Sequence, residues 1–176
     1  VGVGGGGRVN GFPSSAGGVG VRGKAEGGLT AIAGRVVVEE GGTVTGRVRA
    51  IGGSAVIAGR TGGNAVAYAG RVTVAETGRV GGSFGAVAGS AVIAGTVQDD
   101  ATTVAGSVTL EPSANIDGFL TYVGDYEDRG GRVSLGARHV RELSLLPSLT
   151  GAGRVLFPLY LLLPELFAGR ALLAPS

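Results

Sequence analysis

Residues 54–59 read SAVIAG, and the same six letters return unchanged at residues 90–95, 36 positions later. The same offset aligns GGLTAIAGRVVV at 27–38 with GNAVAYAGRVTV at 63–74 and with DDATTVAGSVTL at 99–110. A fixed period of this length is typical of repeat proteins, in which each unit buries its apolar face by stacking on its neighbours. The repeat therefore predicts a stack of similar units with two open ends.

A finer period of six residues runs through the repeat. Every sixth residue from Ile32 to Tyr122 is apolar except Gly62 and Gln98, and a second, weaker apolar position follows four residues later in each hexad. Alternating β-branched residues favour short strands, and the glycines between them suit corners. Glycine makes up 37 of 176 residues. Each costs a helix interior roughly 1 kcal/mol, which argues against helices here.

Three hexads make a triangular coil of 18 residues, so that the 36-residue repeat holds two coils. Side chains 18 positions apart should then lie above one another and form inward ladders. The first predicted ladder is Val38, Val56, Val74, Val92 and Leu110. The second is Ile32, Ala50, Tyr68, Ala86 and Val104. We therefore predict an all-β, single-stranded, three-sided β-helix with five regular coils.

The composition divides the chain into four segments. Residues 1–25 are a glycine-rich segment with an irregular first coil, and residues 26–122 are the β-helix core. Residues 123–136 read as a charged linker that contains glycine. Residues 137–176 form an amphipathic and then apolar tail, whose first part, 137–149, has the pattern of a short helix.

The apolar tail has two open interpretations. Residues 155–174 have the length of a spanning helix, but two prolines, a glycine and two charges interrupt them, and the charge-free run before Pro164 has only nine residues. The segment could pack over the last coil as a cap, or it could insert shallowly into a membrane and meet acidic lipid headgroups. The side chains predicted to contact lipid are Leu156, Phe157, Leu159, Tyr160, Leu161, Leu162, Leu163, Leu166 and Phe167.

Charge and residue usage argue against several functions. A formal charge of +2 is too small to indicate nucleic-acid binding, and the absence of cysteine excludes disulfides and thiol chemistry. His139, the only histidine, lies outside the predicted coils. Solenoid enzymes that hold metal or transfer acyl groups need imidazoles in or between their coils. We therefore expect no catalytic residue, cofactor, metal or small-molecule substrate.

Three weaker motifs have plain structural explanations. Residues 18–23 fit G-x-G-x-x-G, but no strand–helix pattern supports a dinucleotide site. Acidic residues recur at one corner, where solvent is their expected surrounding: Glu39, Glu40, Glu76 and Glu111. Arg35 and Arg71 would lie about 10 Å apart on stacked coils. They either pair with those glutamates or form a sparse stripe that binds anions.

The hexad V-x-G-x-V-x, with glycine two residues after the apolar position, and the closing phrase VTLEPSANIDG at 108–118 resemble the bactofilins. The resemblance covers about residues 9–122. It implies a right-handed β-helix that forms filaments end to end without nucleotide. It also implies a cytoplasmic scaffold for cell shape at the inner face of the membrane.

Physical reasoning supports the same expectation, because the end coils of a β-helix leave backbone groups unpaired and can recruit further copies. We expect a self-assembling scaffold whose main partner is itself, with lipid as a second partner through the tail. The predicted contacts at the two ends are Val9, Phe12, Val21, Phe119, Leu120 and Tyr122. The alternative is a solenoid that binds polysaccharide or a peptide. A hexapeptide-repeat enzyme is disfavoured by the missing histidines.

Overall fold

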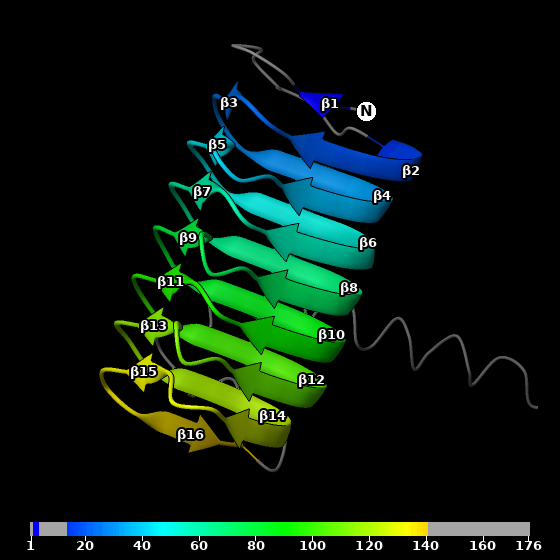
Figure 1. Ribbon diagram of the computed structural model, residues 1–176. Coiled ribbons are helices and arrows are strands. Elements are labelled where there is room, and N and C mark those ends of the chain that lie inside the picture. The colour runs from blue at the N-terminus through cyan, green and yellow to red at the C-terminus, as the bar shows by residue number, and fades with distance from the viewer. Residues whose placement is uncertain (1, 4–13, 141–176) are drawn as a thin grey trace, which may run out of the picture.

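The computed structural model describes residues 2–3 and 14–140, which form an all-β parallel solenoid of about seven turns with roughly 18 residues per coil. Its strands form two sheets that run the length of the stack (Figure 1). The nine-stranded sheet contains, in spatial order, β1 (Gly2–Val3), β2 (Ser14–Val21), β4 (Leu29–Val38), β6 (Val48–Ile57), β8 (Ala65–Val74), β10 (Phe84–Ile93), β12 (Ala101–Leu110), β14 (Leu120–Asp128) and β16 (Ala137–His139). The seven-stranded sheet contains β3 (Lys24–Ala25), β5 (Thr43–Val44), β7 (Arg60–Thr61), β9 (Arg79–Val80), β11 (Thr96–Val97), β13 (Asn115–Ile116) and β15 (Arg132–Val133).

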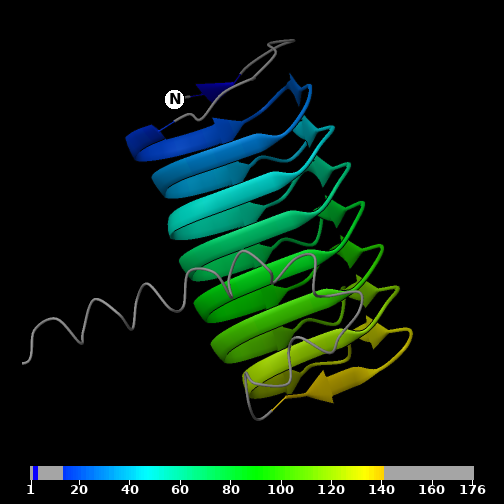
Figure 2. The same cartoon turned by 180° about the vertical axis from the view of Figure 1, so that it is seen from behind.

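Each regular long strand covers two sides of the solenoid because it bends at a central glycine. In β10 this residue is Gly89, where an added Cβ would come within 2.9 Å of the carbonyl oxygen of Gly70 on the coil before. We call the part before the bend side 1, the part after it side 2, and the short strands side 3. Figure 2 shows from behind how the long strands wrap around the edge of the stack. The three-sided coil is thus built from one bent strand and one short strand.

Successive coils differ in length, and the difference arises at one corner. Val38 pairs with Ile57, nineteen positions on, and Ile57 pairs with Val74, seventeen positions on. The corner between sides 2 and 3 holds four residues at 39–42 but only two at 58–59. A longer and a shorter coil therefore make up each 36-residue repeat.

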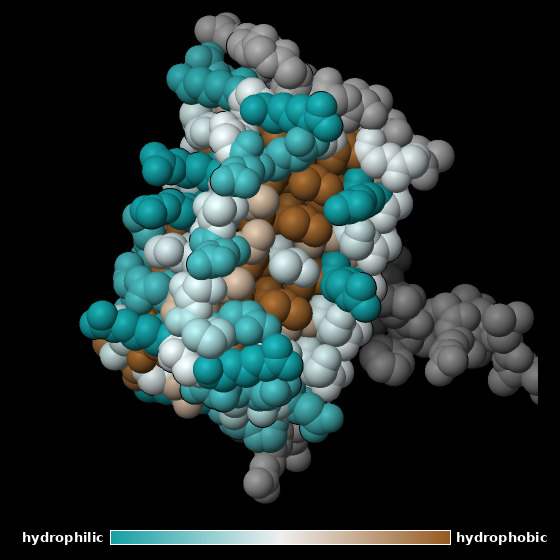
Figure 3. Space-filling model, in the orientation of Figure 1, coloured by the Kyte–Doolittle hydropathy of each residue, from teal (hydrophilic) through white to brown (hydrophobic). Residues whose placement is uncertain are grey.

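The alternation changes which residues face the core. In a strand, a shift of one residue moves a side chain to the opposite face. The first predicted ladder is therefore correct for Val38, Val74 and Leu110 but wrong for Val56 and Val92, which face outward on side 2 and are partly exposed. Their places in the core are taken by Ile57 and Ile93. Figure 3 shows an apolar stripe down the face that carries the ends of the long strands.

The second predicted ladder is likewise correct for alternate members only, and it is wrong for Ile32, Tyr68 and Val104. Ala50 and Ala86 are buried, but Ile32 leaves 52% of its surface exposed and Tyr68 faces outward in the same column, two strands away. The inward column of this part of side 1 comprises Ala31, Ala50, Ala67, Ala86, Thr103 and Tyr122. The outward column comprises Ile32, Ile51, Tyr68, Val87, Val104 and Val123.

The solenoid continues past Tyr122, where the hexad pattern of the sequence ends. Residues 123–136, predicted as a linker, belong mainly to β14 and β15, and residues 137–139 form β16 rather than the start of a helix. The pattern is obscured because the pairing of β12 with β14 shifts register by one residue. The shift falls at Gly124, whose φ of 114° favours glycine. No helix long and apolar enough to span a membrane occurs among residues 2–3 and 14–140.

Candidate functional site

The carboxyl-terminal end of the described solenoid is a pair of edge strands, β15 and β16. Each is hydrogen-bonded to the preceding coil: beside β15, Arg132 N–H donates to Ala114 O at 2.9 Å, and beside β16, Val140 N–H donates to Tyr122 O at 2.9 Å. Among the described residues, no further strand pairs with their outer edges. An edge of this kind is a template for another strand. Both edge strands pair in parallel with the coil before them, as the strands of the interior coils do.

An aromatic layer fills the interior of this end. The rings of Tyr122 and Tyr126 stack with centroids 4.4 Å apart, and His139 stacks on Tyr122 at 5.1 Å. Burial, helped by the carboxylate of Asp128 and by Tyr122, raises the pKa of Tyr126 to about 12. His139 occupies the inward column of side 1, directly after Tyr122. The core thus reaches the edge strand, and one of its rings, His139, is exposed there.

The residues predicted as contacts at this end lie one coil inside the edge strands. Leu120 is fully buried in the core, and Tyr122 is held between two rings. The ring of Phe119 is partly buried, with the guanidinium of Arg138 4.1 Å from its centroid. The inward side chains at the edge itself are those of Val133, Ala137 and His139. Tyr126 and Val133 are the apolar signals of this last coil in the sequence. They fit the repeat only if the register shift at Gly124 is taken into account.

The amino-terminal end is less open. Val21, a predicted contact, is fully buried and pairs with Val3 of β1, which covers the end of β2. On the other sheet, β3 is the edge strand and carries Lys24 outward and Ala25 inward. Val9 and Phe12 lie outside the described residues, as do the lipid contacts predicted between Leu156 and Phe167.

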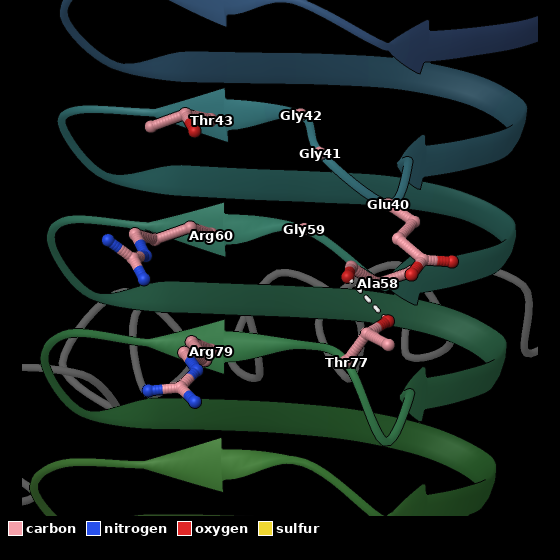
Figure 4. A pocket seen from close by; sticks show the side chains of 9 residues that line it. All are labelled: Glu40, Gly41, Gly42, Thr43, Ala58, Gly59, Arg60, Thr77 and Arg79. Carbon is pink, nitrogen blue, oxygen red and sulfur yellow. Dashed lines mark hydrogen bonds between the residues drawn. The ribbon is translucent and has the colours of Figure 1, made fainter.

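A notch lies at the corner between sides 2 and 3, where a short corner is recessed between two longer ones. The short corner is Ala58–Gly59, and the flanking corners are residues 39–42 and 75–78. The resulting cavity has a volume of about 360 Å³. Thr77 Oγ1 donates to Ala58 O at 2.8 Å and so links one flanking corner to the short corner (Figure 4). The lining residues are Glu40, Gly41, Gly42, Thr43, Ala58, Gly59, Arg60, Thr77 and Arg79.

Two arginines at this notch occupy neighbouring rungs of side 3. Arg60 and Arg79 pair in parallel register, and both side chains are exposed. Figure 4 shows the two guanidinium groups one above the other, directed the same way and away from Glu40. Within the described part of the chain, neither arginine has a carboxylate within ion-pair distance. The notch therefore carries two positive charges that the described residues leave unbalanced.

The glutamates of the acidic corner are exposed or form ion pairs, as expected. Their partners, however, are not the arginines named from the sequence. Glu39 accepts from Arg22 at 2.7 Å, and Glu111 accepts from Arg129 at 2.9 Å. Arg35 and Arg71 are exposed and, between residues 14 and 140, form no ion pair with the corner glutamates.

The remaining motifs show no chemical site in the described region. Residues 18–23 are the end of β2 and the bend after it. Among all the described residues, no group of three or more histidine, aspartate and glutamate side chains comes together to hold a metal ion. Comparisons with protein-family models, with curated proteins and with solved structures found no significant match to this chain.

Proposed function

We propose that this protein is a structural scaffold that assembles end to end. The observation that carries the proposal is the edge formed by β15 and β16, which keeps the parallel pairing of the interior coils on side 3 and on the first part of side 1. Pairing this edge with an end coil of another copy would continue both sheets across the contact. A contact that does not close on itself generates a filament.

The side chains at this edge favour association. Ala137 and His139 would be buried by another coil, as their counterparts in earlier coils are. Leu135, in the corner before β16, leaves 58% of its surface exposed. Neither the stacking of coils nor the burial of these side chains requires a bound nucleotide, so assembly should proceed from the chain alone.

The resemblance to bactofilins supports two further parts of the proposal. The coils wind in a right-handed sense, and the filaments lie in the cytoplasm at the inner face of the membrane. The apolar tail would attach them there through Leu156 and its neighbours. Sedimentation with acidic liposomes, with and without residues 143–176, tests the attachment. Equal sedimentation of the two chains would contradict it.

Negative-stain electron microscopy of the purified chain, without nucleotide, tests the assembly. The wild-type chain should form filaments. His139→Glu places a carboxylate in the inward column at the edge, where burial by another copy would be costly. It should give short filaments or monomers. Arg138→Glu, on the outward face of the same strand, is the matched control and should still form filaments.

Circular dichroism should show that both variants keep their strands. Filaments of His139→Glu as long as those of the wild type would exclude this edge as the contact.

A further inference from the structure

The stacked arginines of the notch are electrostatically unfavourable on their own. Like charges directly opposite on neighbouring strands destabilise a sheet. Arg60 and Arg79 are such a pair, with backbones about 4.8 Å apart as in any sheet. In the other pairs of the same outward column, at least one partner is a threonine or an asparagine, as with Thr96 and Asn115. A bound anion would therefore stabilise the arginine pair, and the described residues place no carboxylate within ion-pair distance of it.

The notch gives a ligand room beside the pair. Each flanking corner has two more residues than Ala58–Gly59, and Gly59 lets this short corner pack closely against the corner before it. An added Cβ there would meet the carbonyl oxygens of Glu39 and Gly42. The hydroxyl of Thr43 lines the same cavity. A small ligand could thus lie in the notch with its anionic group over the arginines.

We propose that the notch binds a small ligand through an oxyanion (a phosphate, sulfate or carboxylate group) held by Arg60 and Arg79. Guanidinium groups match the geometry of these oxyanions and can bind them through paired hydrogen bonds. Glu40 lies at the far end of the cavity, with its carboxylate directed away from the arginines, so it does not neutralise them (Figure 4). The site lies in the middle of the stack and does not rest on end-to-end assembly.

Equilibrium dialysis of the full chain at low ionic strength tests the site, because it measures binding whether or not the chain polymerises. One set of samples contains inorganic pyrophosphate and a second contains glucuronate, to separate a free phosphate from a carboxylated sugar. We expect saturable binding of at least one probe with one site per chain. Arg60→Ala and Arg79→Ala should each weaken that binding about tenfold or more, as expected for lost hydrogen bonds to a charged group.

The matched controls are Arg35→Ala and Arg71→Ala, which remove equally exposed arginines from side 2. They should leave the affinity within about twofold of wild type, since screening weakens distant surface charges. The proposal is overturned if neither probe saturates. It is also overturned if the double variant lacking Arg60 and Arg79 binds as tightly as the wild type, or if the control variants lose as much affinity.

Discussion

Phe84 lies directly opposite Ala65 on the neighbouring strand, in an inward column of side 1. Ala101 lies opposite it on the other neighbouring strand. Phe84 is 1% exposed, and the two alanines are fully buried. Close packing of stacked coils requires that a large ring be flanked by small side chains, and this column satisfies it. The ring fills the space that the two alanines leave.

Phe84→Ala should therefore destabilise the solenoid strongly. Removing a buried phenylalanine leaves a cavity and costs about 3–5 kcal/mol. Urea denaturation followed by circular dichroism measures the loss. Val87→Ala, on the outward face of the same strand, is the control and should cost less than about 1 kcal/mol. A larger loss for Val87→Ala than for Phe84→Ala would mean that side 1 faces the core in the opposite sense.

The alternation of coil lengths predicts a contrast between two adjacent residues. Ile57→Asp places a charge in the core and should prevent folding, because a buried unpaired carboxylate is very costly. Val56→Asp points outward on side 2 and should fold with a small change in melting temperature. Thermal melts of the two variants decide the register. A folded Ile57→Asp beside an unfolded Val56→Asp would contradict it.

The recessed corner requires glycine at position 59. Gly59→Ala should lower the melting temperature clearly, since the new methyl group must displace backbone oxygens rather than a movable side chain. Gly17→Ala is a suitable control because an added Cβ there meets nothing within 4 Å. We expect the control to be neutral or slightly stabilising. If the two variants melt alike, the corner is looser than its geometry indicates.

The buried hydroxyl of Tyr126 predicts a loss of stability at alkaline pH. Its pKa is about 12 in the folded protein against an ordinary value of 10.0. Between these values the unfolded chain loses the phenolic proton while the folded chain keeps it, so the free energy of unfolding falls as pH rises. Below pH 10 this residue should contribute no pH dependence.

Denaturation curves from pH 9 to pH 12, compared between wild type and Tyr126→Phe, isolate this effect. The decrease should be smaller in the variant, which has no phenolic proton. Identical pH profiles would show that Tyr126 ionises as readily in the folded protein as in the unfolded chain.

The sequence predicts the repeat unit well but the phase of every second coil poorly. Two unequal corners compensate each other over 36 residues, so Val38 and Val74 keep their predicted inward places. The intervening coil shifts by one residue, and Ile57 rather than Val56 enters the core. A hexad count assumes three equal sides and cannot detect a corner that loses two residues.

The candidate sites were harder to predict for the same reason. The Arg60–Arg79 pair is nineteen residues apart and becomes a pair only once the coil lengths are known. The hexad count does not extend to the final coil because Gly124 shifts the pairing by one residue. The proposal of end-to-end assembly, in contrast, rests on the open ends that the repeat itself predicts, and only the residues at the edge required the structure.

Cross-linking through the two edge strands of the seven-stranded sheet tests the assembly most directly. The chain has no cysteine, so Lys24→Cys on β3 and Arg132→Cys on β15 introduce the only thiols. Within one chain these positions are six strand spacings apart, about 29 Å, which a short bifunctional maleimide cannot span. Every cross-linked species must therefore join different copies.

The account predicts that the double variant, treated with a short bifunctional maleimide without nucleotide, forms a ladder of dimers, trimers and longer species on a denaturing gel. The single variants should stop at dimers if like ends meet, and should remain monomeric if unlike ends meet. A double variant that stays monomeric although both thiols react with the reagent would contradict end-to-end assembly.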